Sequence, residues 1–410
     1  MEYSDYLDAY RNHNSSVEKF LVSKNDTSLE INQQHNIMVL VGNGFDIDLL
    51  QRYGTQKIDG RNVLTIYQDF FKECMLAMGK DENKDNEVIL DFVNSIFFKE
   101  LKKRYKNRDK NWADFESWLP EITNNYTIKE LSDGLNSLQS CFSFFLDFVV
   151  NRDVKHIINQ IAQQRKTNLA IRSLSCFLKD LSEEEYKTLF FPRTTAYKDI
   201  FNYLFVNFNF TNLLDNYIYL DKNAFDIHRD KYDIRNFQFY PNPKSCPTIY
   251  KGRTNTKWIN DSTSWSSILH TRVIHPHGQQ SIPRSLLFGA DDESLEKNRR
   301  ESRFDKEYWT RYSIEYEKLF SQTQLFIIYG SSIGESDKWW WKEICSRLAK
   351  NYGSYPSAEL IVYSYRKKFD KNAFVKKYVK DSKERIRVSN RIHVREYNNS
   401  DQNVFLSFKS

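Results

Sequence analysis

The feature that most constrains the fold is a continuous apolar run, Ile37–Val41, which stops at a glycine. A short run of this kind is typical of a strand that is buried on both faces of a sheet. Such strands belong to parallel sheets, because helices must then cover both faces. The residues after the run predict a tight strand-to-helix turn, and they are Gly42, Asn43, Gly44, Phe45 and Asp46.

Further apolar runs follow in the second half of the chain, and helical patterns separate several of them. The runs are Tyr203–Phe208, Phe225–His228, Arg272–His275, Leu286–Phe288, Leu325–Tyr329, Leu360–Ser364 and Ile392–Tyr397. The helical patterns between them include Tyr308–Phe320 and Asp337–Lys350. Strands that alternate with helices predict an α/β, Rossmann-like fold, with a mostly parallel sheet and helices on both faces.

A long helical stretch interrupts this alternation after the first strand. Apolar residues recur at three- and four-residue steps in Val88–Leu101 and again in Leu135–Ala162, which indicates amphipathic helices. We therefore predict a large helical insertion. The expected division is a polar N-terminal extension over residues 1–35, a Rossmann-type core over 36–66 and 198–410, and the insertion over 67–197.

Composition and net charge limit the cellular compartment and the kinds of ligand that we expect for this protein. The net charge of +6 over 410 residues permits an anionic ligand without requiring nucleic acid. The 5 cysteines are widely spaced and form no CxxC motif, which favours reduced thiols and argues against a zinc ribbon. The first residues are polar and mixed in charge, and no apolar run approaches the ~20 residues of a membrane span. We expect a cytoplasmic protein with no membrane segment and no bound metal.

Small and polar residues follow the other predicted strands. They are Asn209 and Thr211, then His277 and Gly278, then Gly289, and finally Gly330, Ser331, Ser332 and Asp337. Ligands of open α/β sheets bind beyond the carboxyl ends of the strands, so these residues predict one site. An asparagine there both donates and accepts hydrogen bonds, which suits a ribose hydroxyl or a water. A histidine is the usual general base near neutral pH.

Together these motifs resemble the AbiH family of phage-defence proteins, over roughly residues 36–340. The segment Trp112–Glu116 is also similar to that family's Trp-x-Asp-x-Glu element. The order of the motifs resembles sirtuin-like domains: a glycine loop, an asparagine turn, His-Gly, Phe-Gly and Gly-x-Ser. The resemblance implies a nucleotide ligand across the strand ends, with NAD as the substrate.

The resemblance further implies antiphage defence through hydrolysis of the bond between nicotinamide and ribose. Asn209 would position the ribose or the attacking water, His277 would accept a proton, and the Gly42–Gly44 turn would receive the pyrophosphate. Asp46 conflicts with a phosphate there unless it caps the helix, contacts a ribose or holds a metal. A phage-derived trigger, a partner protein or a homo-oligomer would keep such a toxic activity off before infection.

Three other functions fit parts of the sequence. Gly330–Gly334 matches the G-x-S-x-G pattern of serine hydrolases, with Ser332 as nucleophile, Asp370 or Asp381 as acid and His393 as base. A nuclease would use Asp46, Asp114 and Glu116 with a divalent metal. A non-catalytic sensor would bind a nucleotide and relay the signal through the helical insertion.

Overall fold

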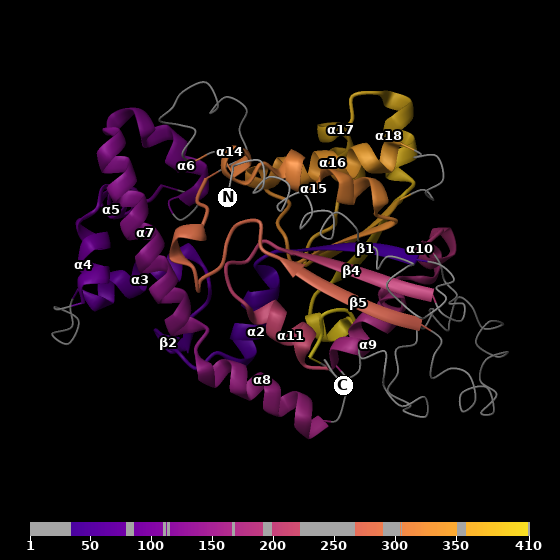
Figure 1. The fold of residues 1–410 in the computed structure, drawn as a ribbon, viewed down its shortest axis with the longest axis horizontal. Coiled ribbons are helices and arrows are strands. Elements are labelled where there is room, and N and C mark those ends of the chain that lie inside the picture. The colour runs from indigo at the N-terminus through magenta and orange to yellow at the C-terminus, as the bar shows by residue number, and fades with distance from the viewer. Residues whose placement is uncertain are drawn as a thin grey trace, which may run out of the picture.

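The computed structural model describes residues 34–78, 86–109, 112, 115–165, 169–191, 199–221, 267–289, 304, 306–350 and 358–408. In this part of the chain, a six-stranded sheet has the order β5-β4-β1-β6-β7-β8, and every neighbouring pair is parallel (Figure 1). The strands are β1 Gln34–Val41, β4 Asp199–Asn207, β5 Ser267–Ile274, β6 Leu325–Tyr329, β7 Glu359–Tyr365 and β8 Ile392–Tyr397. A small antiparallel pair, β2 Lys57–Ile58 and β3 Arg61–Asn62, lies apart from this sheet.

The strand order is that of dinucleotide-binding Rossmann folds. The chain builds outward from β1 through β4 to β5, then returns to the other side of β1 and builds outward through β6, β7 and β8. Val41 pairs with Asn207 on one side and with Tyr329 on the other, so the three central strands end at one level. The reversal of order between β1 and β6 is where such sheets bind ligands. The predicted α/β class is confirmed.

Helices cover both faces of the sheet, as the apolar run of β1 requires. Ile37, Val39 and Val41 belong to one buried core, while Met38 and Leu40 belong to the other. The first core is closed by α2 Gly44–Tyr53, α9 Leu169–Cys176 and α11 Leu213–Tyr219. The second is closed by α15 Tyr312–Gln322, α16 Lys338–Ala349, α17 Lys371–Tyr378 and α18 Ser382–Ser389, and Figure 1 shows the two groups on opposite sides of the sheet.

The first part of the helical insertion lies beyond one end of the sheet, on the side toward which β5 points (Figure 1). Its helices on that side are α3 Tyr67–Ala77, α4 Glu87–Asn94, α5 Ile96–Lys106, α6 Phe115–Ile122 and α7 Ile128–Val149. Farther along the chain, α8 Arg152–Arg165 packs against α2, and α10 Glu183–Thr188 lies near the opposite end of the strands (Figure 1). Gln139 and Ser143 of α7 donate hydrogen bonds to the carbonyls of Leu286 (2.8 Å) and Gln280 (2.5 Å). The insertion therefore holds the segment that follows β5. None of the described helices is both long and apolar enough to cross a bilayer.

The remaining elements are short. They are α14 Lys306–Thr310 and the 3-10 turns η2 Thr123–Asn125, η3 Phe177–Asp180, η6 Pro283–Ser285, η9 Glu335–Asp337 and η10 Ser400–Gln402. The strand predicted at Leu286–Phe288 is wrong: these residues follow η6 without joining the sheet. They are apolar because Leu286 and Phe288 pack into the core shared with the insertion. The predicted strand Phe225–His228 and the alternative ligand Asp114 lie outside the described residues.

Three predicted helical stretches are each divided in two. Leu135–Ala162 is shared between α7, which ends at Val149, and α8, which begins at Arg152. In Val88–Leu101, α4 ends at Asn94, and the Ser95 side chain caps α5 by accepting from the Phe98 N–H (3.3 Å). In Tyr308–Phe320, Arg311 adopts a left-handed conformation (φ 47°) and separates α14 from α15. Apolar periodicity continues across the break at Ser95, because Ile89 and Phe92 of α4 and Phe97 and Leu101 of α5 pack into the same core.

Candidate functional site

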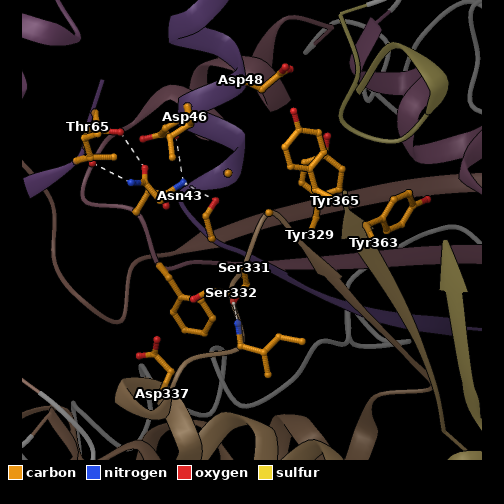
Figure 2. A pocket seen from close by; sticks show the side chains of 18 of the residues that line it. Asn43, Asp46, Asp48, Thr65, Tyr329, Ser331, Ser332, Asp337, Tyr363 and Tyr365 are labelled. Carbon is orange, nitrogen blue, oxygen red and sulfur yellow. Dashed lines mark hydrogen bonds between the residues drawn. The ribbon is translucent and has the colours of Figure 1, made fainter. Parts of the chain in front are cut away.

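A cavity of about 1200 Å³ opens at the carboxyl ends of β1, β4, β6 and β7 (Figure 2). Small-molecule sites are usually about 300–1,000 Å³, so this one has room for a dinucleotide. Most of the predicted site residues line it: Gly42, Asn43, Gly44, Asp46, Asn209, Thr211, His277, Gly330, Ser331, Ser332 and Asp337. Phe45, Gly278 and Gly289 do not. The parallel sheet thus brings together motifs that are far apart in sequence.

The glycines after β1 and β6 serve to pack two loops against each other. The Gly42 N–H donates to the Tyr329 carbonyl (2.9 Å), and the Gly44 N–H donates to the Gly330 carbonyl (2.8 Å). A Cβ on Gly42 would lie 2.7 Å from the Gly330 oxygen, which no side chain tolerates. The next amide of α2, that of Phe45, donates to the Gly42 carbonyl (3.2 Å). These three N–H groups already have protein acceptors, so they are not available to a phosphate.

Replacing Gly330 with alanine should lower the free energy of unfolding by about 1–3 kcal/mol, the usual cost of overpacking. Gly330 has φ +65°, and its Cβ would lie 2.8 Å from the backbone nitrogen of Phe45. Chemical denaturation measures the effect. Gly334→Ala is the matched control, because its Cβ would meet nothing closer than 3.6 Å. Equal stabilities for the two variants would contradict the loop-packing account.

Asn43 connects the loop after β1 to the segment that precedes α3 by two hydrogen bonds. Its side-chain amide donates to the Thr65 carbonyl, its side-chain oxygen accepts from the Thr65 hydroxyl, and both distances are 2.8 Å (Figure 2). It also occupies the N-cap position of α2, although its side chain makes no capping bond. Asn43 therefore shapes the cavity wall.

Asp46 joins the loops after β1 and β4. It does not cap α2 but lies in its first turn with no solvent exposure. Its carboxylate accepts from the Thr211 hydroxyl (2.5 Å) and from the Asn209 amide (3.1 Å). Burial raises the pKa of Asp46 to about 7, although these hydrogen bonds oppose the shift. Near neutral pH the group is therefore partly protonated, which weakens its conflict with an anionic ligand.

Asn209 is positioned by the same cluster. Its side-chain NH₂ group donates to Asp46 and also lies 3.3 Å from the Gly42 carbonyl, while its backbone N–H donates to the Asn207 side chain (3.1 Å). It does not cap the following helix, because the N-cap of α11 is Asn212. With both amide hydrogens directed at protein acceptors, the side-chain carbonyl is the group left to accept a hydrogen bond from a ligand.

His277 lies on the same cavity, against an ion-pair chain. It is 4% exposed and stacks on Phe208 with the ring centroids 5.0 Å apart. Its Nε2 is 3.0 Å from Asp337 Oδ1, although the two groups are not aligned as a hydrogen bond. Burial by itself would raise the pKa of Asp337, but the charges of Lys306 and His277 hold that pKa well below its usual range. Asp337 is therefore a carboxylate that attracts the Nε2 proton of the ring.

Lys306 extends this chain to the helical insertion. Its side chain is 1% exposed, and Nζ lies 3.2 Å from Asp337 Oδ1 and 3.0 Å from Glu116 Oε2. Glu116, in α6, also accepts a hydrogen bond from the Tyr67 hydroxyl (3.2 Å). Sequence reasoning missed Lys306, because a lone lysine in a helical pattern gives no signal. The sequence indicated Glu116 through the Trp-x-Asp-x-Glu element and as a ligand in the nuclease alternative, but not as a partner of Lys306.

The serine-hydrolase residues are not assembled. Asp370 and Asp381 cap α17 and α18, where they accept backbone N–H bonds of 2.9 and 2.8 Å. His393 is outside the cavity lining and bonds to Glu185 (3.1 Å) and Glu359 (3.0 Å). The positive φ angles of the G-x-S-x-G loop are at Gly330 and Ile333 rather than at Ser332. The strained nucleophile turn of such hydrolases is therefore absent from this loop.

The nuclease alternative gains no support from the described residues. Asp46 accepts hydrogen bonds from Asn209 and Thr211, and Glu116 pairs with Lys306. In the described part of the chain, no three His, Cys, Asp or Glu side chains gather closely enough to hold a metal ion. A two-carboxylate metal clamp would require these groups to leave their present partners.

Comparison with known proteins gives one positive result. A family model described as bacteriophage abortive infection AbiH matches residues 38–355. Searches of curated proteins and of solved structures found no significant match. The matched segment runs from β1 through α16 and contains Asp46, Asn209, His277, Lys306 and Asp337. The chain therefore belongs to the AbiH family of bacteriophage abortive infection proteins.

Proposed function

We propose that this cavity hydrolyses the N-glycosidic bond between nicotinamide and ribose in NAD, or in a close nucleotide relative, as a step of abortive infection. The observation that carries the proposal is the convergence of Asn209 with a carboxylate-paired His277 in one cavity. That cavity lies at the strand ends of a sheet with Rossmann strand order, where dinucleotides bind. The order of the motifs, which is similar to sirtuin-like domains, supports the same choice of substrate.

The chemistry requires a weak nucleophile to be oriented and one proton to be removed. Water attacks C1′ of the ribose, the C–N bond breaks, and its electron pair neutralises the nicotinamide ring as it leaves. Asp337 favours the ring proton of His277 on Nε2, so Nδ1 is the atom that accepts the proton from water. The Asn209 carbonyl accepts a hydrogen bond from that water or from a ribose hydroxyl. The products are nicotinamide, the remaining ADP-ribose and one proton.

The helical insertion is the element through which a trigger would act. Glu116 of α6 binds Lys306, which binds Asp337, which in turn contacts His277. A phage product, a partner protein or a second copy of the chain that moves α6 would therefore change the environment of the proposed base. Through this chain of contacts, a change in the position of α6 could keep the hydrolase inactive before infection.

Nicotinamide release from NAD is the decisive measurement. His277→Ala should reduce the rate by about 10²–10⁴-fold, the usual contribution of a general base. Ser332→Ala is the matched control, because Ser332 lines the same cavity and has no role in the proposed chemistry. Its rate should be unchanged.

Other outcomes would redirect the assignment. An inactive Ser332→Ala protein would favour the serine hydrolase. A parent protein that releases no nicotinamide, but that NAD protects against heat, would be a nucleotide sensor. A parent protein with neither property would exclude NAD as the ligand.

A further inference from the structure

A loop outside the predicted motifs forms a second part of the cavity wall. It begins at Tyr365, the last residue of β7, and continues through Arg366, Lys367 and Lys368; all four residues line the cavity and are exposed. Figure 2 shows Tyr365 beside Tyr329 and Tyr363, on the opposite side of the view from Asn43 and Thr65. We call this segment the β7 loop. Its three cationic side chains and one aromatic ring all line the same cavity.

The backbone of the β7 loop is fixed by hydrogen bonds. The Arg366 N–H donates to the Tyr397 carbonyl (2.8 Å), and the Ser364 hydroxyl donates to the Lys367 carbonyl (2.8 Å). Arg366 adopts a left-handed conformation with φ 53°, which is uncommon for a residue with a side chain. Strained positions of this kind cluster at ligand-binding sites, where the surrounding structure holds them in place.

Tyrosine rings form an aromatic wall beside these charges. The Tyr365 ring is 47% exposed and lies 5.4 Å from the Tyr397 ring, centroid to centroid. Tyr397 in turn stacks on Tyr329, with the centroids 6.2 Å apart. The Arg366 guanidinium carbon lies 4.8 Å from the centroid of the Tyr365 ring. An exposed ring backed by a row of buried rings is a rigid surface on which a nucleobase can stack.

The charge of this part of the cavity favours an anion. Of the carboxylates on the same wall, Asp48 bonds to Arg52 (3.2 Å) and Ser400 (2.8 Å), and Asp370 caps α17. In the contacts described, neither carboxylate forms an ion pair with Arg366, Lys367 or Lys368. At the turn after β1, where a Rossmann fold usually supplies phosphate donors, the amides of Gly42, Gly44 and Phe45 already have protein acceptors.

We propose that the β7 loop binds the nucleoside diphosphate half of the substrate, with its base stacked on Tyr365 and its phosphates held by Arg366, Lys367 and Lys368. The inference rests on the proposed function for the identity of the whole substrate. It moves the phosphate site from the glycine turn after β1 to the opposite side of the cavity. The nicotinamide end then extends toward Asn209 and His277.

Binding of ADP to the full chain, measured by calorimetry, tests this subsite without any catalysis. The double variant Lys367→Ser/Lys368→Ser should bind ADP about tenfold more weakly or worse, because two charge-assisted phosphate contacts are lost. Lys380→Ser/Lys383→Ser is the matched control: it removes the same charge from exposed positions outside the cavity lining. This control should bind ADP within about twofold of the parent.

A second pair of variants separates the base from the phosphates. Tyr365→Ser should weaken ADP binding and leave inorganic pyrophosphate binding unchanged, whereas Tyr365→Phe should leave both unchanged. Absence of ADP binding to the parent, or equal binding by the loop and control double variants, would overturn the proposal.

The subsite and the proposed reaction can fail separately. If ADP binding depends on the β7 loop but NAD is not cleaved, the proposed subsite is supported and the proposed hydrolysis is contradicted. If NAD is cleaved and Lys367→Ser/Lys368→Ser keeps the parent KM for NAD, the proposed hydrolysis is supported and the proposed subsite is contradicted.

Discussion

Lys306→Met is expected to lower the free energy of unfolding by about 3 kcal/mol at pH 7, the lower end of the cost of breaking a buried ion pair. The ammonium is 1% exposed and lies within 3.2 Å of both Asp337 and Glu116. Methionine fills the space but leaves two carboxylates without their shared cation. The carboxylates are 15% and 16% exposed, so water screens part of the repulsion. Urea denaturation gives the value.

The same variant should also lose nicotinamide release, because Asp337 no longer has the cation that holds it beside His277. Lys376→Met, on the exposed side of α17, is the matched control and should stay within about 0.5 kcal/mol of the parent. Adding Glu116→Gln and Asp337→Asn to Lys306→Met should restore part of the lost stability, because no unpaired charge remains. A loss below about 1 kcal/mol for the single variant would show that the carboxylates find water or other partners without cost.

Asp46 should make the protein less stable as pH rises from about 4 to about 7. Its pKa is raised from 3.8 to about 7 by burial, so the unfolded chain loses this proton at a lower pH than the folded protein. Stability from this group is therefore complete below pH 4, falls as pH rises to 7 and is constant above. A shift of about three pKa units corresponds to a fall on the order of 4 kcal/mol.

Asp46→Asn removes this titration and should flatten that part of the profile. An asparagine oxygen can still accept one hydrogen bond, and the Thr211 hydroxyl can turn to accept another. Asp215 and His275, which bond to each other (3.1 Å), also act on Asp46 through their charges. Denaturation curves at several pH values, taken as the difference between variant and parent, separate the titration of Asp46 from theirs. The exposed Asp133→Asn in α7 should keep the parent profile. Parallel profiles for Asp46→Asn and the parent would show that the buried carboxyl titrates normally.

The sequence alone determined the class of fold and the edge of the sheet at which the site lies. Continuous apolar runs such as Ile37–Val41 must be buried on both faces, which requires a parallel sheet between helices. In a parallel sheet all carboxyl ends lie at one edge, so residues after separate strands, such as Asn209 and His277, are brought to one place. Periodicity and turn residues report these local properties directly.

Only the tertiary structure decided which groups touch. Lys306 meets Asp337 and Glu116 because three distant segments pack together, and no local pattern encodes that meeting. Leu286–Phe288 has the composition of a strand, yet it packs in the shared core without joining the sheet, since burial and strand pairing leave the same apolar signal. The glycines after β1 looked like a phosphate site, but their amides bond to the loop after β6. Sequence patterns record burial and backbone freedom, whereas the partner of each polar group is fixed only when the chain has folded.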